Sequence, residues 1–392
     1  MTTVTEFKIP QLADVIAGTS NNTSQANDDA PKPKFSLKQF SVTGKSEVMR
    51  EKMQNDVFVL DGIALLGQLT AIYAKPNTGK TLITLAMLKD SIETGRIKGE
   101  NVYYINADDS YKGAIQKLEF AEAYQFEMIL PDSKESEVEF KVSEFNGYLQ
   151  QLINDDAAHG VVVILDTLKK FTDLMDKKQG SNFMKLARAF SMAGGTMIML
   201  AHTNKNRNAD GKVVAGGTSD IGDDACCAYT LDEVKCGGAE LIRTSKDVLF
   251  ENFKSRGNVE KELLVNYSVI PTDSYFDKLE SVKVANDADI EQAKKERNTA
   301  TQTEDDAEAI KAIIDGINQG NHKKADLLKF AMGIEWKISH RKAKSALERY
   351  TGTKLSNSSF WRLQIGEKNS QIYYLLAPES DSPEDYEKAK NG

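Results

Sequence analysis

The sequence contains little cysteine and no long apolar run, and both absences narrow the kinds of protein it can encode. Its three cysteines, Cys226, Cys227 and Cys236, are an odd number without the paired spacing of a metal site. No unbroken apolar run is long enough to span a bilayer, and the first residues lack the charged-then-apolar pattern of a signal peptide. We therefore expect a protein of the reducing cytoplasm with no membrane partner.

An excess of positive charge is also missing. The chain has 50 Lys and Arg residues against 58 Asp and Glu residues, and its net charge is −8. This balance argues against a protein coated over its whole surface with nucleic acid, although it leaves room for a local basic patch. Hydrophobic residues make up 40% and charged residues 28% of the 392 residues. These proportions are ordinary for a globular protein. The length is sufficient for one large core and a smaller second domain.

The stretch 69–88 carries the most informative motif of the chain. Residues 69–73 have the apolar pattern of a buried strand, and apolar residues with helical spacing follow from Leu82. Between them lie the eight residues of a candidate phosphate-binding loop: Ala74, Lys75, Pro76, Asn77, Thr78, Gly79, Lys80 and Thr81. In such a loop, backbone N–H groups and the positive end of the helix dipole hold the phosphates of a nucleotide.

Two residues of this loop have specific expected roles. The Lys80 ammonium reaches the β- and γ-phosphates of ATP, and the Thr81 hydroxyl is a ligand of Mg²⁺. ATP and Mg²⁺ are therefore the expected cofactors. Ala74 departs from the motif, which usually begins with glycine, and an alanine costs little there if its φ is negative. The alternative is a chance G-K-T sequence at the start of a helix.

Strands and helices alternate along residues 69–201, which predicts an α/β fold with a mainly parallel sheet. The expected strands are 69–73, 101–106, 126–130, 161–165 and 196–201, and the expected helices are 46–55, 82–95, 111–123, 140–153 and 182–193. Ligands of parallel sheets bind at the carboxyl ends of the strands. Because Lys80, Asp108, Asp166 and His202 all fall at such ends, we expect them to form one site.

Three of these residues have open alternatives. Asp166 follows an apolar strand, as does the acidic residue on the Mg²⁺ side of a nucleotide-hydrolysing site; alternatively it caps the next helix. Asp108 or its neighbour Asp109 could polarise the attacking water, or both could belong to a solvated loop. His202 could sense the γ-phosphate, or it could be a hydrogen-bonded histidine at a strand end.

Five segments resemble, in order, the RecA-like core of the RepA-type plasmid and phage helicases. They are A-K-P-N-T-G-K-T at 74–81, A-D-D-S at 107–110, L-D-T-L-K-K-F at 165–171, H-T-N-K at 202–205 and K-S-R-G at 254–257. The likeness covers residues 56–267. It implies a RecA-like fold in which Lys80 and Thr81 bind ATP–Mg²⁺ and Asp166 supports the metal and the water. His202 would couple the nucleotide state to the DNA-facing loops.

The resemblance also implies a homo-oligomer, a hexameric ring with ATP bound between subunits. Lys254 and Arg256 are similar to the pair that reaches into the neighbouring subunit's site, where an arginine stabilises transition-state charge. Alternatively, K-S-R-G is only a polar strand end. The family usually has glutamate at the position of Asp108. The shorter aspartate implies that the water sits differently or that hydrolysis is slow.

Two basic regions are candidates for contact with DNA. The loop after His202 carries Lys205, Arg207 and Lys212, which in a ring would face single-stranded DNA; an ordinary surface loop is the alternative. Residues 307–376 are expected to form three short helices and a hairpin, as in a winged helix. Their segment 321–363 has a net charge of +7. The expected DNA contacts there are Arg341, Lys342 and Lys344, and protein docking is the alternative.

These features predict a RecA-like ATPase core followed by a C-terminal winged helix. The expected order is a disordered arm at 1–45, the core at 46–283 with an antiparallel extension at 226–269, a linker at 284–306, the winged helix at 307–378 and an acidic flexible tail at 379–392. The expected function is an ATP-dependent DNA helicase or translocase in DNA replication, with single-stranded and duplex DNA as partners. Two alternatives remain: a recombination, repair or loading factor that does not unwind, and a DNA-binding regulator that uses ATP as a switch.

Overall fold

The computed structural model describes residues 35–52, 56–204, 207–208, 212–217, 219–234, 244–356 and 358–377. Contacts within the chain divide it into two compact units, Met1–Met53 and Gln54–Gly392. The first unit contains a 3-10 helix, η1 (Leu37–Phe40), and the helix α1 (Ser46–Lys52). Helix α1 confirms the described part of the predicted helix 46–55. Residues 37–40 lie in the predicted disordered arm, but the Ser36 side chain accepts a hydrogen bond from the Lys38 backbone and closes a turn there.

The rest of that predicted arm, residues 1–34, lies outside the described residues, and so does the predicted acidic tail at 379–392.

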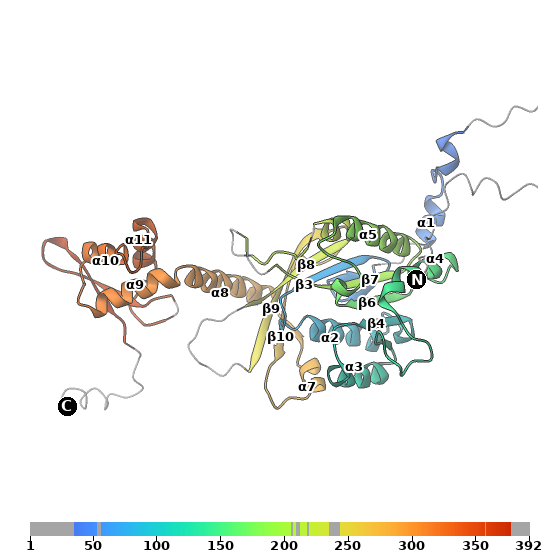
Figure 1. The fold of residues 1–392 in the computed structure, drawn as a ribbon, viewed down its shortest axis with the longest axis horizontal. Helices are drawn as coiled ribbons and strands as arrows, with labels where there is room; N and C mark the ends of the chain where they lie inside the picture. The colour runs from blue at the N-terminus through green and yellow to red at the C-terminus, as the bar shows by residue number, and fades with distance from the viewer. Residues whose placement is uncertain are drawn as a thin grey trace, which may run out of the picture. The chain divides into compact units, whose positions relative to one another are not determined.

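A nine-stranded sheet forms the centre of the second unit, in the order β11-β10-β9-β8-β3-β7-β6-β4-β5 (Figure 1). Its strands are β3 (Leu69–Ala74), β4 (Val102–Asn106), β5 (Glu127–Ile129), β6 (Val162–Asp166), β7 (Thr196–His202), β8 (Cys227–Val234), β9 (Ser245–Ser255), β10 (Glu262–Ser268) and β11 (Lys283–Val284). Strands β8 to β5 pair in parallel, and β9, β10 and β11 add antiparallel pairs. This confirms the predicted α/β class with a mainly parallel sheet.

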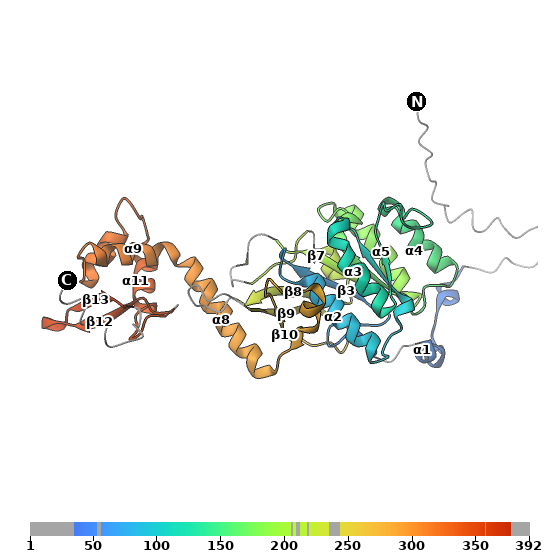
Figure 2. The ribbon, with the colours of Figure 1, turned by 90° about the horizontal axis from the view of Figure 1, so that it is seen from below.

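Helices cover both faces of this sheet (Figures 1 and 2). The helices are α2 (Lys80–Glu93), α3 (Tyr111–Tyr124), α4 (Phe145–Asn154), α5 (Lys177–Met192), α6 (Asp220–Asp224) and α7 (Tyr275–Glu280). Alternate residues of β3 point to opposite faces, because Ile72 joins a core with α2 and α3 while Ala71 joins a second core with α4 and α5. A separate two-stranded sheet, β1 (Phe58–Leu60) and β2 (Ala64–Leu65), precedes β3.

Three predicted elements differ in detail from the structure. The predicted helix 182–193 begins earlier, at Lys177, because the Asp176 side chain caps the first turn of α5. The predicted helix 140–153 begins only at Phe145, because residues Val142–Glu144 form a 3-10 turn, η3. Residues 226–269 were predicted as an antiparallel extension. Strand β8 does pair antiparallel with β9, but it pairs parallel with β3 on its other side. The change of direction therefore lies between β8 and β9, one strand later than predicted.

The predicted linker at 284–306 is instead mostly a 19-residue helix, α8 (Asp287–Asp305), and this prediction is wrong. Asn286 caps its first turn, and Ile290 and Ala293 pack into a small core with Val234, Leu249 and Leu264 of the antiparallel strands. The apolar contact is narrow, and Arg297 is the next buried residue on the same face. Because part of the buried face of this helix is a charged residue, its sequence lacks the apolar periodicity that predicts a helix.

The C-terminal residues form three helices and a hairpin, as predicted (Figures 1 and 2). They are α9 (Ala307–Asn318), α10 (Lys324–Ala331), α11 (His340–Arg349), β12 (Trp361–Ile365) and β13 (Gln371–Leu375). Their hydrophobic core is separate and surrounds Trp361, whose indole N–H donates to the Leu347 carbonyl. We call residues 307–376 the C-terminal module. Across the part of the chain that the structure describes, no helix has the length and apolar character needed to cross a membrane.

Candidate functional site

The candidate phosphate loop follows β3 and ends at the start of α2. Ala74 is the last residue of β3 and its φ is not positive, so the alanine meets the condition set for it. Asn77 and Gly79 have positive φ values of 64° and 93°. A Cβ atom at Gly79 would lie 2.6 Å from the Tyr267 ring, so both the backbone angle and the space require glycine. The sequence therefore builds a tight turn whose N–H groups precede the N-terminus of α2.

A buried carboxylate, Asp166, joins the loop to the neighbouring strands. The Lys80 ammonium lies 2.9 Å from Asp166 Oδ1, and both side chains are at least nine-tenths buried. The Thr81 hydroxyl donates to Asp166 Oδ2 at 2.5 Å and the Tyr104 hydroxyl at 2.7 Å. Burial raises the pKa of the Asp166 carboxyl, but Lys80 and the two hydroxyl groups outweigh it and hold this pKa below its usual value. Asp166 is therefore ionised at neutral pH.

These residues line a cleft of about 320 Å³ at the carboxyl ends of β3, β4, β6 and β7. The predicted site residues that border it are Lys75, Pro76, Asn77, Gly79, Lys80, Thr81, Asp108, Asp166 and His202. The other lining residues are Leu82, Asp109, Lys117 and Tyr275. Residues that follow or end four different strands thus meet in one cleft, as their positions at the carboxyl ends of the strands predict.

The two carboxylates considered for the attacking water both have lysine partners. Asp109 accepts a hydrogen bond from Asn106 Nδ2 at 2.8 Å and pairs with Lys117. Asp108 is more exposed, and its carboxylate lies 3.6 Å from the Lys169 ammonium. Each carboxylate is thus already paired with a lysine in this structure.

His202 ends β7, directly opposite Ala74 in the register of β3 and β7. Its Nδ1 atom is buried and has no hydrogen-bond partner within the described part of the chain. Burial lowers the pKa of the imidazole, and the nearby Lys80 and Lys169 ammonium groups lower it further. The ring is therefore neutral at neutral pH, with hydrogen-bonding capacity to spare next to the phosphate loop.

Sequence reasoning missed Tyr104, Lys117 and Tyr275. Tyr104 lies inside β4, where an aromatic residue predicts packing, and only its partner Asp166 reveals a polar role. Burial and the Asp166 charge raise the pKa of Tyr104, so its hydroxyl stays protonated and donates. Tyr275 begins α7, far along the chain, and its buried hydroxyl has no partner among the described residues. No sequence signal connects Tyr275 to the loop, because its position depends on the antiparallel strands.

The predicted pair, Lys254 and Arg256, lies at the end of the strands opposite to the cleft. Ser255 pairs with Cys227, and Cys227 pairs with Thr70 near the start of β3. A Cβ atom at Gly257 would touch Gln68, which precedes β3. Because the phosphate loop follows the far end of β3, about 15 Å of strand separates Arg256 from its own loop. The structure does not bring Arg256 into its own cleft, and the Lys254 ammonium donates to the Asp223 carbonyl at 2.9 Å.

The loop after His202 is described only in part, and Lys205 lies outside the described residues. Arg207 makes two hydrogen bonds with the Asp232 carboxylate, at 2.6 and 2.8 Å. Lys212 lies 2.8 Å from Glu251. The predicted DNA-binding Arg207 is thus engaged by a buried carboxylate of β8, and Lys212 by one of β9.

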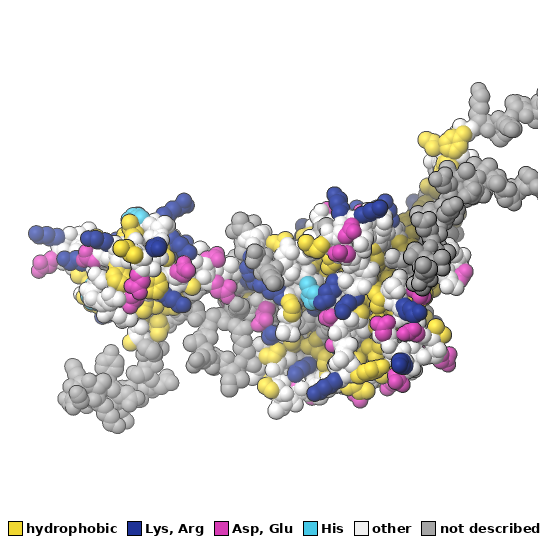
Figure 3. Space-filling model, in the orientation of Figure 1, with side chains coloured by type: hydrophobic (Ala, Val, Ile, Leu, Met, Phe, Trp, Pro, Cys, Tyr) yellow, Lys and Arg dark blue, Asp and Glu magenta, His cyan; other side chains and the backbone are white. Residues whose placement is uncertain are grey.

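The cations predicted on the C-terminal module lie on α11. Ala343, Ala346 and Leu347 form its buried face, whereas Arg341 and Lys344 are exposed and Lys342 is half-buried. Figure 3 shows Lys and Arg side chains on the surface of this module. Lys324 and Arg349 are instead held by Glu348 and Asp306. The predicted contact residues are therefore available to an external anion.

No protein-family model matches this chain, and no curated protein matches it. The resemblance of its five motifs to a helicase family therefore stays a prediction. What the structure defines is an α/β protein with a large, mostly parallel sheet and a cleft at the carboxyl ends of its strands.

Proposed function

We propose that this protein is a RecA-like ATPase that acts as an oligomeric DNA helicase of the RepA type. The observation that carries the proposal is the convergence of Lys80, Thr81 and Asp166 at the N-terminus of α2. A buried lysine and a hydroxyl at the end of a tight, glycine-containing turn, with a carboxylate at the end of a neighbouring strand, are the side chains expected at a nucleoside triphosphate site.

The residues present fit ATP and Mg²⁺. The Thr81 hydroxyl and the Asp166 carboxylate share a hydrogen bond, so both present oxygen atoms at one place, and hard cations bind oxygen. Magnesium there would neutralise charge that develops on the phosphates. Lys80 would exchange Asp166 for a phosphate oxygen, and Asp166 would keep its two hydroxyl donors. The loop N–H groups would hold the phosphates in place.

Three further residues act around this centre in the proposal. Asp108 orients the attacking water, and the neutral His202 donates or accepts a hydrogen bond when the γ-phosphate is present. Arg256 acts on the site of a neighbouring subunit, because the register of β8 and β9 keeps it away from its own. A ring, hexameric by the resemblance, supplies such a neighbour to each site.

Nucleic-acid contacts follow from the positions of the basic residues. Residues of the loop after His202 would contact single-stranded DNA, and Arg341, Lys342 and Lys344 of the C-terminal module would contact a duplex, as a winged helix does. Their exposure on α11 supports this part of the proposal. A cytoplasmic role in DNA replication completes it.

A second candidate is a DNA-binding regulator in which ATP acts as a switch. The pairing of Asp109 with Lys117 and of Asp108 with Lys169 favours it. A carboxylate that already pairs with a lysine is less free to orient a water molecule, so ATP can bind while hydrolysis stays slow.

Hydrolysis of ATP by the purified protein, with and without single-stranded DNA, tests these proposals. The helicase proposal predicts that single-stranded DNA raises the rate and that ATP then separates a forked duplex. Stimulation without strand separation would indicate a recombination, repair or loading factor. ATP binding without turnover, in either condition, would support the switch.

Deletion of residues 307–392 tests the role of the C-terminal module. The truncated protein should bind duplex DNA more weakly and with a shallower salt dependence, because fewer phosphate contacts release counterions. Its ATP binding should persist, since the cleft lies within residues 75–275. Unchanged duplex affinity and salt dependence would identify the module as a protein-docking unit.

A further inference from the structure

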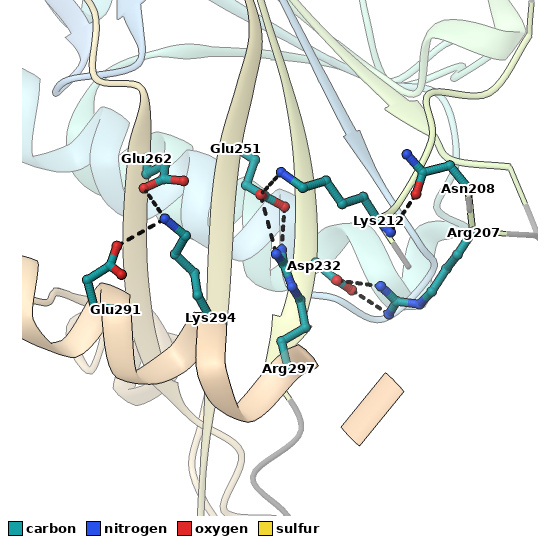
Figure 4. Close-up of polar contacts among 9 residues, drawn as sticks. All are labelled: Arg207, Asn208, Lys212, Asp232, Glu251, Glu262, Glu291, Lys294 and Arg297. Atoms are coloured by element: carbon teal, nitrogen blue, oxygen red, sulfur yellow. Dashed lines mark hydrogen bonds and ion pairs between the residues drawn. The ribbon is translucent and has the colours of Figure 1, made fainter. Parts of the chain in front are cut away.

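Helix α8 packs on the antiparallel strands through a cluster of ion pairs, of which Arg297–Glu251 is buried (Figure 4). Lys294 lies 2.9 Å from Glu262 of β10 and 3.0 Å from Glu291 of its own helix. One turn later, Arg297 pairs with Glu251 of β9, and its side chain is only 5% exposed. The helix that leads to the C-terminal module is thus held by charges as well as by its narrow apolar contact.

Glu251 accepts from two cations that belong to different parts of the chain. Figure 4 shows Arg297 reaching it from α8 and Lys212 reaching it from the loop after His202. The Lys212 ammonium lies 2.8 Å from Glu251, and the Lys212 side chain is half exposed. Burial raises the pKa of the Glu251 carboxyl, but the two cations outweigh burial and lower it. Glu251 is therefore a carboxylate shared between a loop and a helix.

Arg207 and Lys212 of the same loop each pair with a carboxylate of the sheet. The two pairs differ in whether that carboxylate keeps another cation when the loop residue moves away. Asp232 is 4% exposed, and Arg207 is its ion-pair partner within the described chain. A departing Arg207 would leave a buried carboxylate without a cation, which is strongly unfavourable. A departing Lys212 would leave Glu251 with Arg297, a neutral pair. Of the two cations of this loop that the structure describes, Lys212 is thus the one that can be exchanged at low cost.

We propose that Lys212 exchanges Glu251 for a phosphate of a bound single strand, and that Arg297 of α8 controls this exchange through the shared carboxylate. Arg207 and Arg297 are then positioning residues, which hold the loop and the helix on the sheet. This inference rests on the proposed contact between the loop and single-stranded DNA. It adds a linkage between that contact and α8, the helix that precedes the C-terminal module.

The direction of the linkage follows from the charges around Glu251. With Arg297 present, the cluster of Lys212, Glu251 and Arg297 carries one excess positive charge, so Lys212 is held weakly. Without Arg297, Lys212 becomes the remaining cation on a buried carboxylate, and its release becomes costly. Loss of Arg297 should therefore weaken binding of a single strand, even though Arg297 is too buried to touch it.

The test compares Arg297→Gln with Lys294→Gln in the full-length protein. Both changes remove one positive charge from α8, but only Arg297 shares a carboxylate with the loop. The first readout needs no nucleic acid: the rate at which brief treatment with acetic anhydride acetylates Lys212, followed by mass spectrometry. Arg297→Gln should slow this reaction severalfold, and Lys294→Gln should leave it unchanged. Arg297→Lys keeps the charge and should match the wild type.

The second readout is the affinity for a fluorescent oligothymidine at fixed salt. Arg297→Gln should weaken binding about fivefold or more relative to Lys294→Gln, a typical coupling between two sites. In a Lys212→Gln background the two variants should bind alike. Circular dichroism checks folding, and Arg297→Met, which fills the space with an apolar chain, replaces Arg297→Gln if that variant does not fold.

The two readouts separate the possible failures. Equal acetylation of Lys212 in the Arg297 and Lys294 variants would overturn the shared-carboxylate linkage. Slower acetylation with equal oligothymidine affinity would overturn the exchange of Lys212 onto phosphate. Absence of oligothymidine binding by the wild type would refute the proposed DNA contact, while the acetylation comparison would still decide the linkage.

Discussion

Two buried ion pairs of this protein have similar chemistry and different surroundings. Lys80 and Asp166 have exposed fractions of 9% and 4%, and Arg297 and Glu251 have 5% and 11%. The first pair borders an open cleft at the carboxyl ends of parallel strands. The second lies between a helix and antiparallel strands. Burial of a charge pair therefore does not by itself identify a functional site.

The partners of each carboxylate distinguish the two pairs. Asp166 also accepts from the hydroxyls of Thr81 and Tyr104, so it keeps two neutral donors when Lys80 turns to another anion. Arg297 has Glu251 as its ion-pair partner in the described structure, and its loss would remove the buried charge contact between α8 and β9. Lys80 can therefore leave Asp166 to bind a ligand, whereas Arg297 holds α8 on the sheet. Substitutions in the first pair should abolish ATP hydrolysis. Substitutions in the second pair should lower stability and, through Lys212, weaken single-strand binding, but they should leave ATP binding unchanged.

The largest expected effect comes from Lys80→Ala. This variant should lose ATP hydrolysis down to the background rate, because the ammonium that meets the phosphates is gone. It should still fold, since Asp166 retains two hydroxyl donors, but its melting temperature should fall because a buried carboxylate loses its cation. Steady-state phosphate release and thermal unfolding measure the two effects. Lys294→Ala, a lysine outside the cleft, should keep its activity, and wild-type turnover by Lys80→Ala would refute the site.

The cleft was predictable because its residues follow a local rule. Asp166 and His202 each end an apolar strand, and parallel strands bring their carboxyl ends to one edge of the sheet. The rule applies to each residue separately, so no tertiary contact had to be known. The parallel order of strands and the C-terminal helices followed from similarly local patterns of apolar residues.

The Arg297–Glu251 cluster was not predictable, and the physical reason is the same in each missed case. The buried face of α8 consists of Ile290, Ala293 and Arg297, so its apolar pattern is interrupted by a charge that only Glu251 makes acceptable. Tyr275 reaches the cleft only because α7 follows the antiparallel strands. Pairings between distant segments leave no periodic signal in the sequence.

The next effect in size concerns Arg256. Its loss should leave ATP binding intact and lower hydrolysis on the order of a thousandfold, if it acts on a neighbour's phosphates. Arg256→Ala mixed with Lys80→Ala should regain activity, because some interfaces then combine an intact cleft with an intact arginine. The measurement is hydrolysis by co-assembled mixtures at several ratios. Rates that never exceed those of the separate variants would show that Arg256 has no role across subunits.

A smaller effect, on stability, is expected at the second ion pair. Arg297→Met should destabilise the fold by up to about 3 kcal/mol, because α8 loses its buried anchor on Glu251. Lys294→Met, whose lysine is 28% exposed, should cost less than about 1 kcal/mol. Urea unfolding followed by circular dichroism measures both. ATP binding by the folded Arg297→Met protein should match the wild type, and a loss of it would connect the two ion pairs after all.

The smallest expected effect is a pH dependence of the free energy of unfolding that arises from Glu251. The pKa of its carboxyl is lowered from the ordinary value of 4.5, because Lys212 and Arg297 outweigh the effect of burial. A lowered pKa in the folded state means that the charged form stabilises the fold fully above pH 4.5. This contribution is lost as the pH falls through the lower, folded value. Acid should therefore weaken the wild type more than Glu251→Gln, which has no proton to gain at this position.

Urea midpoints of both proteins, measured from about pH 6 down to about pH 3, give the comparison. The wild type should be the more stable protein at the upper end, and the difference should shrink as the pH falls. Other carboxyls with lowered pKa values, Asp166 among them, are common to both proteins and cancel in the difference. A difference that stays constant with pH would show that Glu251 holds α8 by shape rather than by charge.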